Sequence, residues 1–368
     1  MSASGTPLRV HPGAMTDLVA KIMAAGGCND AEATATGEHL IGANLTGHDS
    51  HGLVRVPRYH GWLKDGTLNG HTALRTIADL GQLIQFDGDR GIGQYLAREA
   101  TLVGIERART NGSAIIALRH AGHVGRLGHY AEMAAAEGLV SIQFCNVVSA
   151  GIVAPYGSAQ RHMSTNPVAV GVPNGADDPF ILDFATSLVA EGKALVAATG
   201  GKPLPSNALI GADGRETGDP GALYGTTISE GVPNPRMGPG ALRTMGEHKG
   251  SGLALACDLI AGILTGNGSN VRERPFGNGW LAIFVDPARL DDLGTFRDEI
   301  TEYVDAVRGS RAAIGFDRVR IPGDVERETR ADRSVNGAPL AAAQLDGILD
   351  VARDAGISID RNDLILAA

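Results

Sequence analysis

The stretch from Ala114 to Cys145, AIIALRHAGHVGRLGHYAEMAAAEGLVSIQFC, decides the class of fold. It begins with an apolar run typical of a short buried strand, Ala114 to Leu118, and continues into a glycine-rich loop, His120 to Gly128. A helix, Tyr130 to Glu137, and a second strand, Val140 to Cys145, follow this loop. Strand, glycine loop, helix and strand in this order are typical of a nucleotide-binding unit in an α/β protein.

The glycines of this loop do not have the spacing of the common dinucleotide fingerprint. Gly122, Gly125 and Gly128 are each three residues apart, and no acidic residue closes a second strand about 20 residues further on. The loop alone is therefore a weak indication of a nucleotide, because a plain turn explains the same glycines.

Outward from this stretch, strand and helix patterns continue in both directions. Two helices are predicted between Met15 and Asn44, with Asn29 and Asp30 at the N-cap of the second. Further strands are predicted at 76–87, 168–173, 180–183 and 281–285, and further helices at 95–109, 186–193, 253–264, 293–308 and 339–355. The helix at 95–109 is predicted to end at Asn111-Gly112 in a left-handed stop, and Gly200 to Gly240 to run as a long excursion over the surface.

Composition excludes several classes of protein. The 368 residues carry a net charge of -9, which argues against a nucleic-acid binder because such proteins need clustered Lys and Arg. No apolar run approaches the roughly 20 residues that span a bilayer, so a cytoplasmic location is expected. The three cysteines have no paired spacing, and we expect core residues rather than a disulfide framework or a thiolate metal site.

The densest chemistry lies between Gly47 and Arg55, where GHDSHGLVR brings two imidazoles, a carboxylate, a hydroxyl and a guanidinium together. A guanidinium grips a carboxylate in two places, and an imidazole gives or takes a proton near neutral pH. Arg55 follows His51 by four residues, so a helix here would put both side chains on one face. The pair indicates a site for a small carboxylic acid, although an isolated histidine is more often structural.

A metal site and a hydrolase nucleophile are two alternatives for this region. His48 with His51, and His120 with His123, have a His-x-x-His spacing that can bind a metal, but neither pair has further ligands at a suitable spacing. No metal is therefore expected. A hydrolase with Ser50 as nucleophile would need a glycine where His48 stands, so the nucleophile elbow is absent.

Further along the chain, Lys249 stands among glycines before an apolar helix. Backbone N–H groups and a lysine at the positive end of a helix can hold an anion such as a phosphate. The full phosphate-loop pattern is absent, so an anion site here is an open alternative to a plain turn.

The chain resembles the malate/L-lactate dehydrogenase family of NAD(P)-dependent oxidoreductases, whose cofactor domain is not a Rossmann fold. The resemblance covers about Ala14 to Gly356 and rests on motifs that occur in order. These are Ser50-His51-Gly52 with Arg55 and Tyr59; His123-x-Gly125 with Gly128-x-Tyr130; Thr165-Asn166-Pro167; Leu182-Asp183-x-Ala185-Thr186-Ser187; Asp213-Gly214 with Asp219-Pro220; and His248-Lys249-Gly250.

The resemblance implies an α/β fold, with a non-Rossmann cofactor domain built on a mostly antiparallel sheet and a helical or mixed substrate and dimerisation domain. The expected division is 1–120 for the N-terminal helical part, 121–290 for the NAD(P)-binding domain, and 291–368 for a C-terminal part that returns to the first domain. The implied activity is hydride transfer between a nicotinamide and C2 of a small 2-oxo acid, as in 2-hydroxycarboxylate dehydrogenases. Reduction of a cyclic imine carboxylate, such as piperideine- or pyrroline-2-carboxylate, is the alternative. A metal-dependent lyase or hydrolase, and a non-catalytic nucleotide-binding protein, are weaker alternatives.

The resemblance also assigns roles to residues. His51 is the expected proton donor and acceptor, Ser50 and Asp183 orient it, Arg55 binds the substrate carboxylate, and Thr165 adds a substrate contact. The expected cofactor-binding residues are His123, Val124, Gly125, Arg126, Leu127, Pro173, Asn174, Gly175, His248, Lys249, Arg274 and Gly277. Glu247 stands where the family commonly has glycine, and its charge should repel a 2′-phosphate, so NAD is expected over NADP. A cytoplasmic homodimer without a metal, nucleic-acid or membrane partner is expected.

Overall fold

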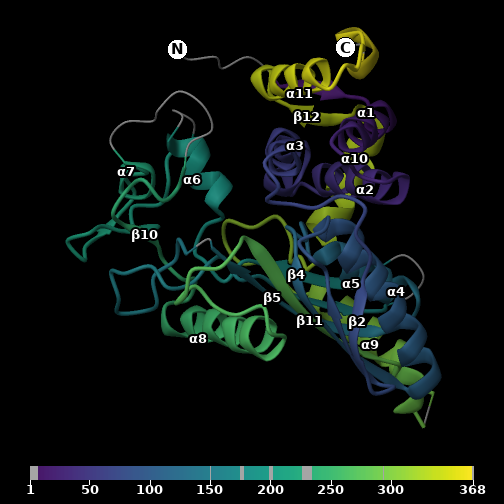
Figure 1. The fold of residues 1–368 in the computed structure, drawn as a ribbon. Coiled ribbons are helices and arrows are strands. Elements are labelled where there is room, and N and C mark those ends of the chain that lie inside the picture. The colour runs from purple at the N-terminus through teal and green to yellow at the C-terminus, as the bar shows by residue number, and fades with distance from the viewer. Residues whose placement is uncertain are drawn as a thin grey trace.

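The computed structural model describes residues 7–149, 151–174, 178–198, 202–225, 234–292 and 294–366. A helical part brings the two ends of the chain together, as Figure 1 shows at its top. Its elements are β1 (Leu8–Val10), α1 (Pro12–Ala25), α2 (Asp30–Leu45), α3 (Val56–Lys64), β12 (Ala338–Leu340) and α11 (Ala342–Asp354). β1 and β12 pair antiparallel, so the N-terminal strand is fixed by residues more than 300 positions away.

A seven-stranded sheet forms the centre of the molecule. Its strands are β2 (Arg75–Asp79), β3 (Leu83–Asp87), β4 (Ser113–Ala121), β5 (Val140–Val148), β6 (Val168–Val172), β7 (Phe180–Phe184) and β11 (Gly277–Val285). The spatial order is β2-β3-β4-β11-β5-β6-β7, and β3 with β4 is the one parallel pair in it. The predicted α/β class with a mostly antiparallel sheet is therefore confirmed.

Helices cover both faces of this sheet. On one face, α4 (Gly93–Asn111) and α5 (Gly128–Ala136) pack on alternate strand residues such as Ile116, Leu118 and Phe284. On the other face lie α8 (His248–Cys257) and its π-helical continuation, Asp258–Leu264 (Figure 1). Successive side chains along a strand point to opposite faces of the sheet, so one sheet can pack against helices on both sides.

Strand β11 lies between β4 and β5, the two strands of the stretch from Ala114 to Cys145. β4 and β5 both pair antiparallel with β11, so they run parallel to each other without touching as a pair. The predicted order of strand, loop, helix and strand is present, but β4 and β5 are not neighbours in the sheet, because a strand that begins 129 residues after Val148 inserts between them.

Besides the core around the sheet and the core of the helical part, a third, smaller hydrophobic core lies beside the sheet. It contains α6 (Glu191–Ala198), β8 (Leu209–Ile210), β9 (Glu216–Thr217), α7 (Gly221–Tyr224) and β10 (Ala241–Leu242). The described residues of 200–240 are therefore not only a surface excursion, because Ala208, Leu209 and Leu223 are fully buried in this core. The helix predicted from Thr186 begins at Glu191, since Thr186 is held by Thr165 through backbone and side-chain hydrogen bonds.

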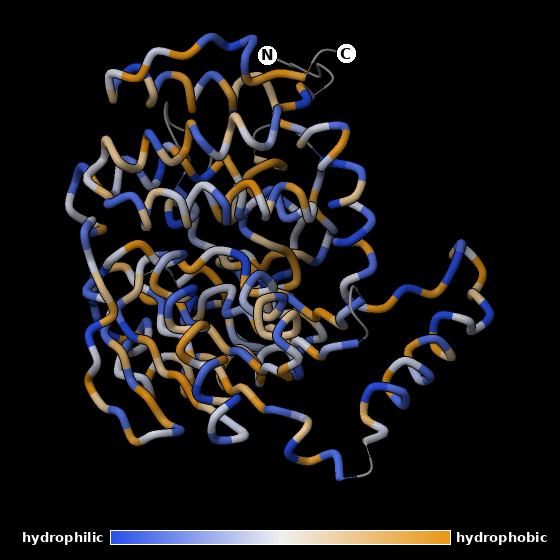
Figure 2. Tube along the Cα trace, turned by 90° about the vertical axis from the view of Figure 1, so that its right-hand side faces the viewer, coloured by the Kyte–Doolittle hydropathy of each residue, from blue (hydrophilic) through white to orange (hydrophobic). Residues whose placement is uncertain are grey.

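The C-terminal region contains an arm and a helix that the sequence patterns missed. The arm is α9 (Phe296–Arg308) with the residues up to Arg320, and it stands off from the body on the right of Figure 2. Leu293, the predicted start of this helix, lies outside the described residues. After the arm comes α10 (Asp324–Asn336), which has no buried residue and so gave no apolar periodicity. The helix predicted from Pro339 begins at Ala342, because Ala338–Leu340 pairs with β1.

Local signals are confirmed where the contacts are short in sequence. Asn29 and Glu32 form a reciprocal capping box at α2, and Gly112 ends α4 with a φ of 86°. The strand predicted at 76–87 is two strands, because Gly81 at φ 83° lies in the turn between β2 and β3. The helix predicted at 253–264 begins at His248 and becomes π-helical at Asp258.

The predicted division at residues 120 and 290 stays a prediction. The core around the sheet combines residues from Ile84 to Phe284. The helical core combines Val10 to Ile92 with Ala338 to Leu364. Within the described ranges, no helix is both long and apolar enough to cross a bilayer.

Candidate active site

The segment from Gly47 to Arg55 is two short 3-10 turns rather than one helix. Asp49–His51 and Leu53–Arg55 flank Gly52, where an added Cβ would lie 2.1 Å from the Asn44 side-chain oxygen. Asn44 accepts from the Leu53 backbone N–H at 2.8 Å and donates to Asp49 at 2.7 Å. The α-helix on which His51 and Arg55 would share a face is thus not formed before α3 begins at Val56, and the segment's shape is fixed by an asparagine of α2.

His51 stacks on His123, which joins the two histidine-rich stretches of the sequence. Their ring centroids are 5.5 Å apart and their planes differ by 10°. His123 Nδ1 lies 2.6 Å from the Tyr59 hydroxyl, and Gln94 donates to that same hydroxyl at 2.9 Å. Because Tyr59 accepts from Gln94, its own proton points to His123 Nδ1, and a neutral His123 then carries its proton on Nε2.

Both stacked histidines are held in the neutral form. Burial lowers the pKa of His51 to about 3, and the positive charge of Arg55 is the next largest cause. Burial, with Arg55 second, also lowers the pKa of His123 well below its usual value. Two neutral imidazoles beside a guanidinium can accept a proton or donate a hydrogen bond to a bound oxygen.

Asp183 lies on β7 and is bonded to a residue other than His51. Its Oδ2 accepts from the Gly128 backbone N–H at 2.7 Å and lies 3.9 Å from Arg126 Nε. In the described part of the chain, no hydrogen bond joins Asp183 to His51, so the orienting role of Asp183 stays a prediction. The charge of Arg126 contributes to the low pKa of His51.

Arg126 does not reach solvent. Its side chain is 2% exposed and donates to Glu132 at 2.7 Å, and its Nε atom has no hydrogen-bond partner among the residues that the structure describes. Glu132 in turn accepts from Arg330 of α10. This buried pairing places Arg126 between α5, β7 and α10, as a charge behind the histidines.

Arg55 has a partner that the sequence patterns did not reveal. Its Nε donates to the Ser50 carbonyl at 2.6 Å, and its Nη2 lies 3.8 Å from Glu191 at the start of α6. Tyr224 donates to Glu191 at 2.8 Å, and Arg58 is close enough for the charges of Arg55 and Glu191 to affect its pKa. Glu191 and Tyr224 were missed because they are more than 130 positions from Arg55 in the sequence, whereas the spacing of three residues between Arg55 and Arg58 could have indicated Arg58.

The glycine loop from His123 to Leu127 is packed against neighbouring elements. The Val124 N–H donates to Asn278 of β11 at 2.9 Å, and the Arg126 N–H donates to His39 of α2 at 2.8 Å. An added Cβ on Gly125, which has a φ of 77°, would lie 2.2 Å from His39. Val124 and Leu127 are buried, so within the loop the imidazole of His123 is the side chain that faces His51.

The other predicted cofactor-binding residues lie in separate places. Pro173 and Asn174 follow β6, and Asn174 accepts from Thr301 of the arm at 2.8 Å. Gly175 lies outside the described residues. His248 and Lys249 are exposed at the N-terminal end of α8, next to Glu247, which has a φ of 56°.

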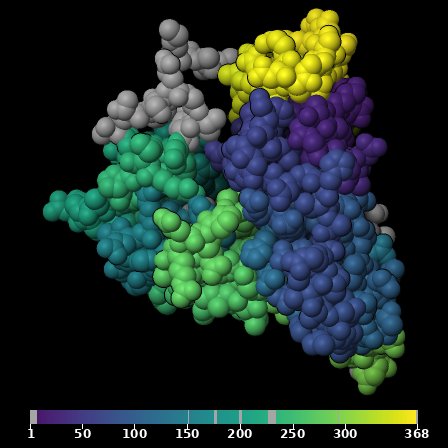
Figure 3. All heavy atoms as spheres, viewed as in Figure 1, coloured from purple at the N-terminus to yellow at the C-terminus, as the bar shows by residue number. Residues whose placement is uncertain are grey.

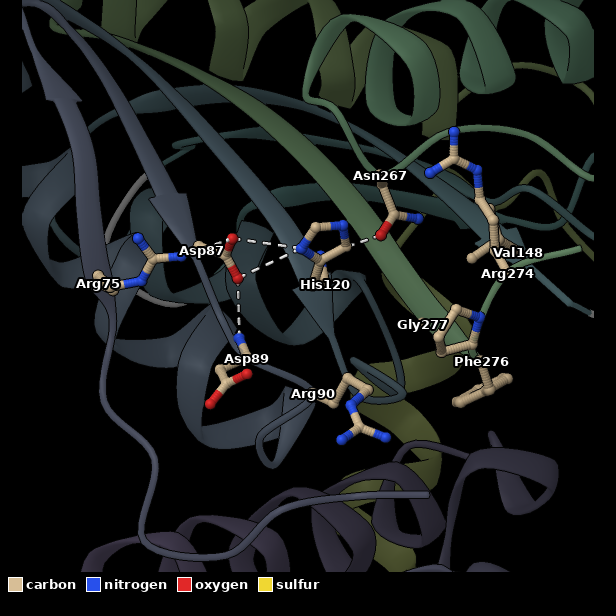
Figure 4. A pocket seen from close by; sticks show the side chains of 11 residues that line it. Arg75, Asp87, Asp89, Arg90, His120, Val148, Asn267, Arg274, Phe276 and Gly277 are labelled. Carbon is tan, nitrogen blue, oxygen red and sulfur yellow. Dashed lines mark hydrogen bonds and ion pairs between the residues drawn. The ribbon is translucent and has the colours of Figure 1, made fainter. Parts of the chain in front are cut away.

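Arg274 and Gly277 line a cavity of about 250 Å³ at the edge of the sheet (Figure 4). Arg75, Arg90 and His120 also line it, and their charges are partly balanced by Asp87 and Asp89. Arg274 has a buried Nε without a hydrogen-bond partner in the described chain. A cavity with several guanidiniums can bind an anionic group.

A run of aromatic contacts joins this cavity to the stacked histidines. Phe276, which lines the cavity, lies 4.6 Å from Trp62 between ring centroids, and Trp62 lies 5.8 Å from Tyr59. Tyr59 contacts His123. Packed aromatic side chains thus connect the lining of the cavity to the stacked histidines.

The His-x-x-His pairs are divided between different partners. His48 lies 3.1 Å from Glu326, and His120 lies 3.3 Å from Asp87, while His51 and His123 face each other. Over the described ranges, no group of three or more His, Cys, Asp or Glu side chains could hold a metal ion. Thr165 holds Thr186 through its carbonyl, and its predicted substrate contact stays a prediction.

Comparisons with known proteins agree with this geometry. The sequence profile of the malate/L-lactate dehydrogenase family matches residues 10–349. The L-lactate dehydrogenase of Cupriavidus necator is 37% identical over 304 residues, which are 81% of this chain and 84% of that protein. Hydroxycarboxylate dehydrogenase B of Escherichia coli K12 is 34% identical over 340 residues, 90% of each chain. The solved structure of malate dehydrogenase from Pyrococcus horikoshii has a TM-score of 0.83 and 27% identity, and covers 97% of this chain and 99% of its own.

Proposed function

The chain belongs to the malate/L-lactate dehydrogenase family of oxidoreductases, and from this premise we propose that it reduces a small 2-oxo acid to the 2-hydroxy acid with His51 as the proton donor. The observation that carries the proposal is the guanidinium of Arg55 beside the stacked imidazoles of His51 and His123. A cation for the carboxylate and an imidazole for the adjacent oxygen are the two groups that this substrate needs.

Arg55 is suited to the substrate carboxylate. Its Nε donates to the Ser50 carbonyl, which orients the guanidinium. Within the described residues its Nη atoms make no hydrogen bond, and the nearest carboxylate to Nη2, that of Glu191, is 3.8 Å away, so both can donate to the acid. Ser50 and Asp183 are assigned to the orientation of His51, and Thr165 to a further substrate contact. His123, with its proton on Nε2, is a second hydrogen-bond donor for the substrate, next to His51.

The low pKa of His51 gives the two directions of reaction different requirements. In oxidation, neutral His51 accepts the hydroxyl proton directly. In reduction, His51 must first take up a proton. The carboxylate of the bound acid supports this step, because it offsets the charge of Arg55, a main cause of the low pKa.

Two cations of the chain also fit a nicotinamide dinucleotide. Arg274 with its unpartnered Nε, and exposed Lys249 at the positive end of α8, are cations suited to an anionic cofactor. When bound, the nicotinamide supplies or accepts the hydride. We favour NAD over NADP because Glu247 beside Lys249 would repel a 2′-phosphate.

We also propose that the protein is a cytoplasmic homodimer. Support for the dimer comes from the arm, where Ile314 and Phe316 are 104% and 71% exposed. Further support comes from the outer face of α8 and its continuation, at the front of Figure 3, where Leu255, Leu259 and Ile263 are exposed. Sedimentation equilibrium tests this state, and a monomer at micromolar concentration would contradict it.

The test of the activity is NADH oxidation with a panel of acids. The panel contains pyruvate, oxaloacetate, 2-oxoglutarate and Δ1-piperideine-2-carboxylate, so the cyclic imine reductase alternative is measured alongside. His51→Ala should lower kcat by about 10²-fold or more while NADH binding, followed by fluorescence, stays unchanged. Full activity in this variant would reject the role of His51, and activity with the imine alone would favour the alternative.

A further inference from the structure

A carboxylate of the third core reaches the guanidinium that we assign to the substrate. Glu191 Oε2 lies 3.8 Å from Arg55 Nη2, and the two side chains are 13% and 16% exposed. Gly192, the next residue, packs against Ser50, where an added Cβ would lie 2.9 Å from the Ser50 Cβ. The start of α6 therefore lies against the segment Gly47 to Arg55 and forms part of the same site.

Glu191 is fixed in this position by a buried tyrosine. Tyr224, at the end of α7, is 2% exposed and donates to Glu191 Oε1 at 2.8 Å. Burial, and then the neighbouring Glu191, raises the pKa of Tyr224, so its hydroxyl keeps the proton that it donates. The carboxylate is thus built into the site rather than carried on a free side chain.

The charges around the site allow one further negative charge. Arg55 and Arg58 contribute two positive charges and Glu191 one negative charge, which leaves a net charge of +1. The charges behind the histidines add nothing to this sum, because Arg126 and Arg330 are balanced by Glu132 and Asp183. A monocarboxylate brings this cluster to neutrality. A dicarboxylate brings a second negative charge next to a fixed carboxylate, and like charges a few ångströms apart repel strongly in a partly buried site.

We propose that Glu191 determines specificity, and that the site accepts monocarboxylic 2-oxo and 2-hydroxy acids with uncharged side chains and rejects dicarboxylic acids such as oxaloacetate and malate. This inference rests on the proposed function, because it takes Arg55 as the carboxylate-binding residue. Glu191 is a specificity residue that acts on the charge of the substrate side chain, and it moves no proton.

The test compares paired acids in the wild type and in Glu191→Gln. With NADH, the wild type should have a higher kcat/KM for pyruvate than for oxaloacetate. Glu191→Gln should move this ratio toward oxaloacetate at least tenfold, which corresponds to about 1.4 kcal/mol. Tyr224→Phe, which keeps the carboxylate but loosens it, should move the ratio in the same direction by less. Glu216→Gln is the matched control, since Glu216 pairs with Arg243 in the same small core and should leave the ratio unchanged.

Calorimetric binding of L-lactate and L-malate, without oxidised cofactor, separates this inference from the proposed function. If the wild type oxidises NADH with no acid of the panel, the proposed activity fails, and the binding ratio still tests Glu191. Preference of the wild type for the dicarboxylate overturns the inference. So does a Glu191→Gln variant in which both acids weaken or strengthen equally, because that result assigns Glu191 only to the structure of the site.

Discussion

The two His-x-x-His segments have the same spacing but are held in place by different means. In each, the second histidine enters the site, where His51 stacks on His123, and the first is bound by a carboxylate. His48 pairs with Glu326 of α10, whereas His120, at the end of β4 with a φ of 53°, pairs with Asp87 of β3. One segment is thus anchored to the helical part and the other to the sheet. The site forms where these two anchors meet.

The largest expected effect is a loss of kcat, and its size should differ between the two stacked histidines. His51→Ala should lower kcat by about 10³-fold, because a positioned acid or base contributes about 10²–10⁴-fold. His123→Ala should lower kcat by about tenfold, which corresponds to the loss of one hydrogen-bond donor. Steady-state kinetics with the best acid of the panel measures both. Equal losses would mean that the two rings share the proton transfer, and His48→Ala serves as the control outside the stack.

The second largest expected effect is a decrease in the free energy of unfolding of the protein at acid pH. Burial lowers the pKa of His39, His51, His123 and His129, so the unfolded chain takes up protons near pH 6.5 that the folded chain does not. The contribution of these histidines to the free energy of unfolding is therefore fully present above pH 6.5 and is lost as the pH falls below it. Asp258, whose pKa is raised to about 6 by burial, acts in the opposite direction.

With four histidines opposed by one aspartate, the free energy of unfolding should fall by about 3 kcal/mol between pH 6.5 and 5.5. Urea unfolding at a series of pH values measures this slope. A free energy of unfolding that is constant over this range would show that these histidines are protonated in the folded protein.

A smaller effect should come from the anchor on the sheet. Asp87 is buried and accepts from Arg119 at 2.9 Å, from Arg75 at 3.1 Å and from the Asp89 N–H at 3.0 Å. Asp87→Asn should destabilise the protein by about 2 kcal/mol, because it removes the charge that these guanidiniums face. The midpoint of urea unfolding measures the loss, and an unchanged midpoint would assign the anchoring of His120 to the backbone of β4.

The smallest effect should come from the anchor on the helical part. The side chains of His48 and Glu326 are each 24% exposed, so Glu326→Gln should cost about 0.5–1 kcal/mol. The same unfolding experiment compares it with Asp87→Asn. A loss as large as that of Asp87→Asn would mean that α10 holds the segment Gly47 to Arg55 as firmly as the sheet holds His120.

The sequence predicted what depends on neighbouring residues. The capping box of Asn29 and the left-handed stop at Gly112 are set within a few positions, and both were found. The family followed from ordered motifs, and the mostly antiparallel sheet from the family. These inferences need no knowledge of which distant elements touch.

The features that the sequence patterns did not predict depend on contacts between residues that are far apart in the sequence. Glu191 meets Arg55 across 136 positions, and no spacing rule links them. α10 was missed because it packs through charged side chains, such as Arg330 on Glu132, and not through an apolar stripe. The insertion of β11 between β4 and β5 is likewise invisible to local patterns, because the sequences of β4 and β5 carry no trace of the strand between them.

The position of β11 sets the order in which the protein can be completed during synthesis. β11 pairs with β4 on one side and β5 on the other, and residues 149–276 must be made after β5 before it exists. At about 5–20 residues per second, the ribosome leaves roughly 6–26 s in which β4 and β5 have emerged without their common partner. Over this interval the edges of two apolar strands lack their partner strand. We therefore expect the nascent chain to depend on chaperones most strongly just before β11 emerges, and truncation before Gly277 to yield an aggregating fragment.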